Sequence, residues 1–279
     1  MKPPFLHGEF DMDYKNIDFK KNAARFRSLA LGASLALLSA GAYAHQIWFE
    51  PASGNTFKLY YGEYDKNMLE VTPGGMDRFR ALKGKLVTKD GEKPLDMTLH
   101  RDFFDIAQKA GKDDTLIAVD QKYPIFKLHD EGTVVDTYWT VATRWVGDLR
   151  PRTPELDLDI VPTGVVDGNR VQFQVFYQKE PLTNKPVTMS AASGWDYLGT
   201  TDGEGKVSFP LPWKGIYVVG VEFRDHTSGE RVNTENVTEK YAIKSFSSTL
   251  AFNQPNGAAP MPRPPSTLPA SEIARLNKK

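Results

Sequence analysis

The sequence predicts an all-β protein made of two consecutive β-sandwich domains that follow a cleaved signal peptide. Downstream of residue 44, short runs of alternating polar and apolar residues are separated by Gly, Asp, Asn and Pro residues that favour turns. Many short strands with regular turn signals are typical of sandwich folds. Without residues 1–44 the 279-residue chain retains 235 residues, which is enough for one large or two small domains, and we favour two.

Residues 20–44 have the three-part layout of a secretory signal. Basic residues between Lys20 and Arg27 precede an apolar run at 29–38, and small residues then lead to Ala42-Tyr43-Ala44. The apolar run is too short to span a bilayer. We therefore predict residues 1–44 to be a signal peptide that is cleaved after Ala44, whether translation starts at Met1 or at Met12.

The composition of the chain limits which partners and which cellular compartment we expect. The 35 basic and 35 acidic residues balance, which gives no electrostatic reason to bind nucleic acid. After the signal no apolar stretch is long enough for a transmembrane segment. The chain has no cysteine, and an exported protein without disulfides fits a bacterial periplasm better than an animal extracellular space.

The N-terminal domain is predicted to span residues 45–162. The turn Ser53-Gly54-Asn55 separates the two strands of a first hairpin, and Lys89-Asp90-Gly91 separates those of a second. We expect one short helix within residues 102–111. The predicted strands are 45–50, 56–61, 78–88, 94–99, 115–119, 133–146 and 156–162.

The C-terminal domain is predicted to span residues 163–252, with the boundary near Pro162. Residues 170–177 alternate cleanly between apolar and polar side chains, as in a strand half-buried against a core. The other predicted strands are 185–191, 206–211, 215–223 and 239–252. Residues 253–279 are dense in Pro, Ala and Ser, and we expect a disordered tail because they offer little apolar surface to bury.

Cleavage after Ala44 would turn His45 into a metal chelator. The new α-amine and the imidazole would then lie on one residue and could close a chelate ring on a single ion. Such nitrogen donors suit Ni(II) or Cu(II), and an α-amine with an unperturbed pKa of about 7.7 to 8 loses its proton readily to a metal. The alternative is that His45 is simply the residue that the peptidase leaves.

His226 is the candidate second ligand. It follows a predicted strand and stands beside Asp225, and a carboxylate next to a histidine can fix its tautomer. His100 and His129 are read as solvated loop histidines, although a contribution from either stays open. No HExxH or CxxC spacing occurs, which disfavours a structural zinc site.

We assign no catalytic residues and no organic cofactor. The chain lacks a cysteine nucleophile and a G-x-S-x-G elbow. The acidic strip of Glu155, Asp157 and Asp159 is read as a solvated face that blocks edge-to-edge pairing of strands.

The segment Ala44-His45-Gln46-Ile47-Trp48-Phe49-Glu50-Pro51 resembles the start of a bacterial periplasmic domain-of-unknown-function family. Residues 156–162 and 171–187 are similar to further motifs of that family. Residues 201–217 resemble a pattern of prealbumin-like and carboxypeptidase-regulatory-like sandwiches, so the resemblance implies two Ig-like or prealbumin-like domains. It covers most of residues 44–252 and departs at Gln46-Ile47, which leaves the metal open, and at Lys179 in a turn.

Members of this family are described as nickel or cobalt uptake accessory proteins (NikM/NikK-like). The resemblance therefore implies a periplasmic protein that binds a transition metal, nickel or cobalt, through His45 and His226, with a membrane transporter as partner. Copper remains possible by chemistry. One alternative is a copper-dependent oxidative enzyme that acts on polysaccharide through the same His45 chelate. Another is a structural or carbohydrate-binding sandwich without metal.

Overall fold

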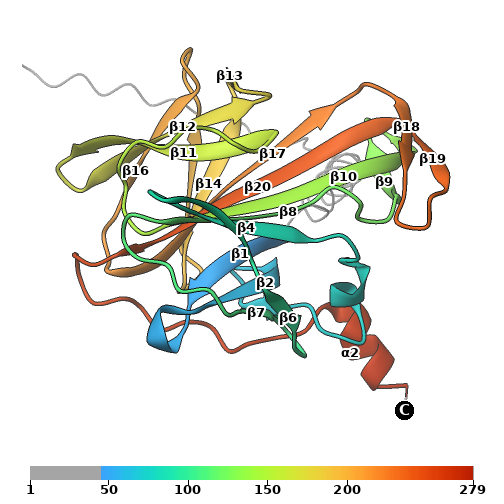
Figure 1. The fold of residues 1–279 in the computed structure, drawn as a ribbon, viewed down its shortest axis with the longest axis horizontal. Coiled ribbons are helices and arrows are strands. Elements are labelled where there is room, and N and C mark those ends of the chain that lie inside the picture. The colour runs from blue at the N-terminus through green and yellow to red at the C-terminus, as the bar shows by residue number, and fades with distance from the viewer. Residues whose placement is uncertain (1–44, 279) are drawn as a thin grey trace, which may run out of the picture. The chain divides into compact units, whose positions relative to one another are not determined.

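The computed structural model describes residues 45–278, which belong to one compact unit that begins at His45. The predicted signal peptide, residues 1–44, lies outside the described residues. The described chain is all-β, as the sequence predicts, with its strands in several sheets (Figure 1). None of its helices is long and apolar enough to cross a membrane.

The first sheet has the strand order β1–β2–β7–β6, and β3 also pairs with β2. Its strands are β1 (Gln46–Pro51), β2 (Phe57–Glu63), β3 (Met68–Leu69), β6 (Met97–Leu99) and β7 (Phe104–Ile106). Two 3₁₀ turns, η1 (Ser53–Asn55) and η2 (Gly75–Arg78), connect parts of this region. The predicted helix within residues 102–111 does not form, because β7 pairs there with both β2 and β6.

The central sheet has the order β15–β14–β17–β20–β10–β8–β4–β5, and β9 also pairs with β10. Its strands are β4 (Lys83–Thr88), β5 (Gly91–Pro94), β8 (Thr115–Asp120), β9 (Phe126–Asp130), β10 (Thr133–Val146), β14 (Pro186–Ala191), β15 (Asp196–Thr200), β17 (Gly215–Asp225) and β20 (Ile243–Gln254).

The third sheet contains β11 (Leu158–Asp167), β12 (Arg170–Tyr177), β13 (Glu180–Pro181) and β16 (Lys206–Pro210). The strands β18 (Gly229–Val232) and β19 (Thr238–Tyr241) form a separate hairpin.

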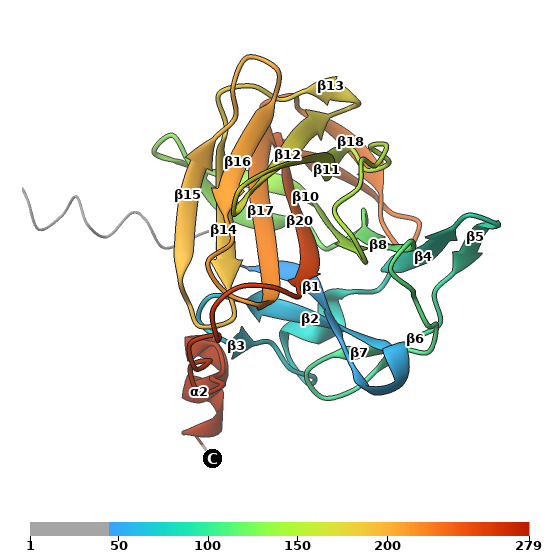
Figure 2. The same ribbon diagram turned by 90° about the vertical axis from the view of Figure 1, so that its left-hand side faces the viewer.

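Strands from both predicted domains share the central sheet. β10 and β20 run parallel with ten residue pairs in register, from Thr137 opposite Ile243 to Val146 opposite Phe252. β20 pairs antiparallel with β17 on its other side. The three long strands lie next to one another in Figures 1 and 2. The predicted boundary at Pro162 falls inside β11, so the chain passes from one half to the other within a strand.

The middle strands of the central sheet are buried on both faces, whereas the edge strands β5 and β15 are largely exposed. On β17, Val218 packs into a core with side chains of the first sheet, whereas Val219 packs into a core with side chains of the third. On β20, Ala251 and Leu250 divide in the same way. Successive residues of a strand point to opposite faces, so residues 45–278 form three β layers with two large cores, and a small third cluster gathers around Ile117, Ala142 and Leu156.

The C-terminal residues are ordered, in contrast to the predicted disordered tail. β20 continues to Gln254, and a helix, α2 (Ala270–Leu276), closes the chain. Between them, Ala258 and Thr267 make isolated β-bridges with Trp213 and Met68. These residues bury little apolar surface, but backbone hydrogen bonds to neighbouring strands hold them in place.

Candidate functional site

Strand register places His45 beside two glutamates. His45 directly precedes β1, where Gln46 lies opposite Gly62 of β2, and the next residue of β2 is Glu63. Gly62 also lies opposite Leu69 of β3, and the residue after Leu69 is Glu70. The three side chains therefore converge at one corner of the first sheet.

Glycine is required where β2 meets β3. Gly62 has a φ of 149°, and a Cβ atom there would overlap the carbonyl oxygen of Met68. A residue with a side chain would hold the two strands apart.

The imidazole of His45 has a carboxylate at each ring nitrogen. Nε2 lies 2.9 Å from Oε1 of Glu70, and Nδ1 lies 3.8 Å from Oε1 of Glu63. The side chain of Glu63 is 11% exposed and that of Glu70 is 14% exposed, whereas the side chain of His45 is 35% exposed. The ring meets Tyr61 edge-on, with 5.4 Å between the ring centroids.

These contacts assign different roles to the two ring nitrogens. A carboxylate only accepts hydrogen bonds, so Nε2–H of His45 donates to Glu70. In the neutral ring Nδ1 then keeps its lone pair and faces Glu63. Nitrogen and oxygen ligands each lie about 2.0 to 2.2 Å from a metal, so two donors on one ion stand roughly 3 to 4 Å apart. The 3.8 Å between Nδ1 and Glu63 falls in that range.

A metal at this corner would need a further donor. Within residues 45–278 no group of three or more His, Cys, Asp or Glu side chains is arranged to hold an ion. The α-amine that cleavage would release on His45 is an additional nitrogen on the same residue. Lys66 already pairs with Glu63 through its other oxygen and would compete with a cation there.

His226 has partners different from those of His45. It follows β17, is 55% exposed, and places Nδ1 3.5 Å from Oδ2 of Asp130 at the end of β9. The neighbouring Asp225, predicted to fix its tautomer, instead accepts hydrogen bonds from Tyr177 and from the backbone of Thr227.

The path of β17 separates the two histidines. The side chain of Gln46 lies against Gly220 of β17, and His226 comes six residues later in the chain. Six residues of extended strand cover about 20 Å. Nothing in the register therefore brings His226 to the corner where His45, Glu63 and Glu70 meet.

The two remaining histidines lie outside this corner. The ring of His100 stacks on Phe103, with 4.9 Å between the ring centroids. His129 is exposed on β9, opposite Val134.

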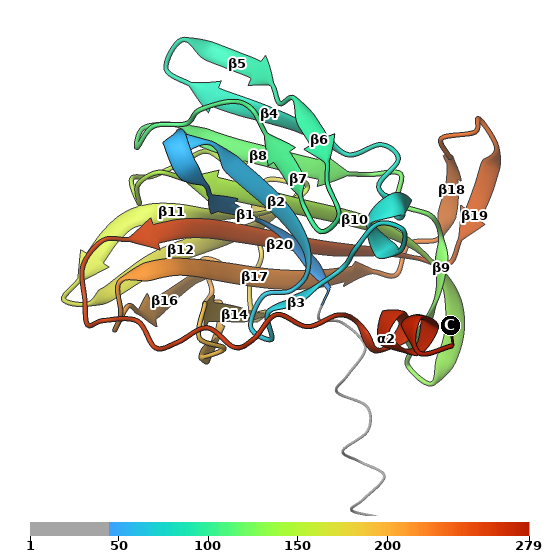
Figure 3. The ribbon, with the colours of Figure 1, turned by 90° about the horizontal axis from the view of Figure 1, so that it is seen from below.

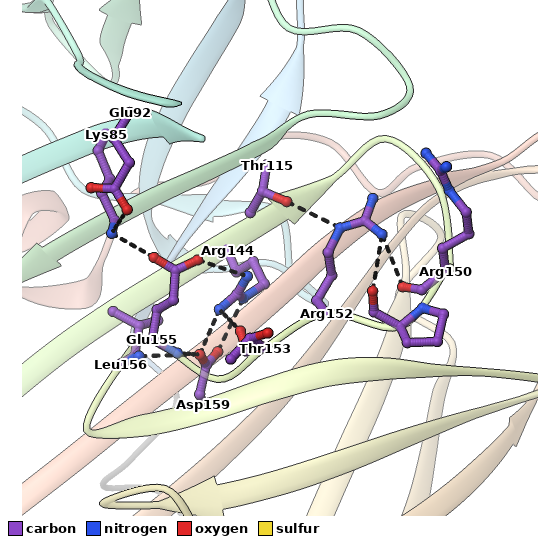
Figure 4. Close-up of polar contacts among 11 residues, drawn as sticks. Lys85, Glu92, Thr115, Arg144, Arg150, Arg152, Thr153, Glu155, Leu156 and Asp159 are labelled. Atoms are coloured by element: carbon purple, nitrogen blue, oxygen red, sulfur yellow. Dashed lines mark hydrogen bonds and ion pairs between the residues drawn. The ribbon is translucent and has the colours of Figure 1, made fainter. Parts of the chain in front are cut away.

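The acidic strip is not a uniform solvated face. Glu155 and Asp157 are exposed as expected, but the prediction is wrong for Asp159, which is fully buried. Oδ1 and Oδ2 of Asp159 lie 3.1 and 2.6 Å from nitrogens of Arg144, which is 1% exposed (Figure 4). Oδ2 also accepts the backbone N–H groups of Glu155 and Leu156. This ion pair joins β10 to β11.

Sequence reasoning missed Glu63 and Glu70. Glu63 had only a partial signal, because it lies two residues beyond the predicted strand 56–61 and comes opposite His45 only in the observed register of β1 with β2. Glu70 had no such signal. It reaches His45 through the pairing of a two-residue strand, which is too short to show a pattern.

Comparison with known protein families matches a part of the chain that does not include the His45 corner. A family model described as "Domain of unknown function (DUF4198)" matches residues 137–225, from within β10 to the end of β17. His45 and His226 fall outside the matched residues. No curated protein matches the chain. Over residues 137–225 the chain is thus similar to a family whose own function is undefined.

Proposed function

We propose that this chain is an exported periplasmic protein that binds a transition metal at His45 and serves nickel or cobalt uptake. One observation carries the proposal: Nε2 of His45 is bonded to Glu70 at 2.9 Å while Nδ1 faces Glu63 at 3.8 Å. Export is supported by the signal-like residues 20–44. For an exported chain, the lack of cysteine fits a bacterial periplasm better than an animal extracellular space.

Each group at the corner has a defined role in this proposal. The α-amine and Nδ1 of the cleaved His45 form a chelate ring, and Oε1 of Glu63 supplies an oxygen donor. Glu70 holds the ring through Nε2, as carboxylates do behind many metal-bound histidines. A set of two nitrogens and one oxygen suits Ni(II), Co(II) or Cu(II). The proposed partner is a nickel or cobalt membrane transporter, as the family resemblance implies.

The test is a calorimetric titration of the chain that begins at His45 with Ni(II), Co(II) and Cu(II). The same chain with one extra residue ahead of His45 is titrated in parallel. The extension moves the amine away from Nδ1, so we expect a loss of at least about tenfold in affinity. We also expect Glu70→Gln to weaken binding by about 10- to 100-fold, which is the usual effect of losing a residue that orients a ligand.

Matched histidine variants serve as controls. His100→Ala removes a ring that stacks on Phe103 and should leave affinity unchanged. His226→Ala decides whether the predicted second ligand takes part. An extension that leaves all three affinities as they were would rule out the N-terminal chelate. If copper alone binds tightly, oxidation of a polysaccharide by the copper form becomes the next assay.

A further inference from the structure

Residues 255–269, here called the C-terminal strap, run from the end of β20 to α2 (Figure 3). The strap is first fixed beside β17. The backbone N–H of Lys214 donates to the carbonyl of Ala258, and the N–H of Ala258 donates to the carbonyl of Pro212.

The strap is fixed next by Arg263, on the first sheet. Its guanidinium donates to both carboxylate oxygens of Glu50 at 3.0 and 2.8 Å and lies 5.3 Å from the ring centroid of Tyr64. The same carboxylate accepts the indole N–H of Trp48. A bidentate pair of this kind fixes orientation as well as distance.

The last contacts of the strap lie on the β2–β3 turn itself. Nδ2 of Asn67 donates to the carbonyl of Pro264 at 2.8 Å. The N–H of Thr267 donates to the carbonyl of Asn67, and the N–H of Leu69 donates to the carbonyl of Thr267, each at 3.0 Å. The strap thus pairs with the outer edge of β3.

The contacts of the strap with Asn67, Met68 and Leu69 lie next to both glutamates at the His45 corner. Glu63 lies opposite Met68, which forms the bridge with Thr267, and Glu70 directly follows Leu69. β3 has only two residues, and a short strand pair contributes little stability without further partners. β3 pairs with β2 on one edge, where the N–H of Glu70 also donates to the carbonyl of Tyr61, and the strap supplies a second partner on its outer edge.

We infer that the C-terminal strap holds Glu63 and Glu70 against His45, and that Arg263 of the strap and Asn67 of the β2–β3 turn are the positioning residues. Its relevance to metal binding rests on the function proposed above, but the effect on the His45 ring does not. Without the strap, β3 loses its outer hydrogen bonds and Glu70 no longer holds Nε2–H in one orientation.

The experiment observes the ring nitrogens of His45 directly. The full chain is labelled with ¹⁵N at histidine, and long-range ¹H–¹⁵N spectra above neutral pH report which nitrogen carries the proton. We expect Nε2–H in the parent chain and a mixture of tautomers in Asn67→Gly and Arg263→Ala. Asn67 has a φ of 48°, so glycine keeps the backbone conformation while removing the bond to Pro264.

Arg275→Ala is the matched control, because Arg275 lies on α2 and pairs with Glu272. It should leave His45 unchanged, and the signals of His100 and His129 should not respond to any variant. Arg263→Lys keeps the charge and should restore part of the parent spectrum. Should Arg263→Ala fail to fold, Asn67→Gly decides alone.

The two proposals fail in different ways. Parent-like His45 signals in Asn67→Gly and in folded Arg263→Ala overturn the role of the strap, whatever the metal result. Mixed tautomers support the strap even if no metal binds, and in that case only the proposed function is lost. If metal does bind to the cleaved chain, both strap variants should weaken it by about tenfold or more, as expected when a ligand loses its orienting partner.

Discussion

Near the start of β11, one buried arginine accounts for the different burial of two neighbouring acidic residues. Asp157 and Asp159 are two residues apart, yet one is exposed and the other is fully buried. The difference is Arg144, whose buried guanidinium stands on the side of β10 that faces β11. The charge of Arg144 and two backbone N–H groups replace the water that Asp159 gives up.

Removing Arg144 should therefore destabilise the protein strongly. Arg144→Met leaves the carboxylate of Asp159 buried without its cation, and loss of one partner of a buried pair costs about 3 to 5 kcal/mol. Urea unfolding followed by circular dichroism measures the change in the free energy of unfolding.

Two further variants test the cause. Arg150→Met breaks surface ion pairs of a side chain that is 58% exposed, and it should leave the free energy of unfolding nearly unchanged, because solvent screens such pairs. The double variant Arg144→Met with Asp159→Leu should recover most of the loss. If the double variant is as unstable as the single one, the unpaired charge is not the reason.

At the scale of the elements, the β2–β3 turn determines where Glu63 and Glu70 lie relative to His45. It places Glu63 and Glu70 on either side of one imidazole, although they are separated by seven positions in the chain. The turn depends on the close approach of Gly62 to β3 and on the outer pairing with Thr267.

Gly62→Ala should disrupt this turn. The added Cβ would overlap the carbonyl oxygen of Met68, and a φ of 149° is unfavourable for alanine. We expect a loss of about 1 to 3 kcal/mol in the free energy of unfolding, the usual range for such backbone strain, together with weaker metal binding. Gly132→Ala, also at positive φ but in open space, should cost less. Equal losses would mean that the approach to Met68 does not matter.

Local patterns predicted elements well where turn residues and alternation act over few residues. The alternation of residues 170–177 appears in β12, with Val171, Phe173 and Val175 buried. The parallel pairing of β10 with β20 left no such trace, because a strand buried on both faces reads the same beside any neighbour. The path of residues 255–269 was missed for a related reason, since its backbone hydrogen bonds leave no sequence pattern and its side-chain contacts, such as Arg263 with Glu50, join residues far apart in the chain.

At the candidate site, sequence reasoning singled out His45 but not the carboxylates beside it. His45 was singled out by its place after a cleavage motif, which is a local signal. Glu70 is positioned by long-range register, and the carboxylate near His226 is Asp130 rather than the adjacent Asp225. Chemistry between distant residues depends on the fold and could not be read from spacing.

At the scale of the whole molecule, the central sheet ties both halves together. β20 stands between β10 and β17, and the cores on its two faces both include its side chains. Within residues 45–278, the first and third sheets each bury their apolar face against the central sheet.

The protein should accordingly unfold in one step. We expect circular dichroism and tryptophan fluorescence to give coincident urea transitions, because separating the halves would expose both cores. Residues 45–162 produced alone should lack stable structure, since β10 loses its partner β20. Two resolved transitions, or a folded fragment 45–162, would show that the predicted domains are independent units.

The parallel pairing of β10 with β20 also affects the rate of folding. Thr143 and Thr249 are hydrogen-bonded partners that lie 106 residues apart in the sequence. Contacts of such high sequence separation slow folding, because the entropy of closing the loop is lost before the contact forms. Until residues near the C-terminus become available, the long strands lack their central partner. Slow completion of the central sheet is compatible with the export proposed above, because the signal-like residues stand at the opposite end of the chain from β20.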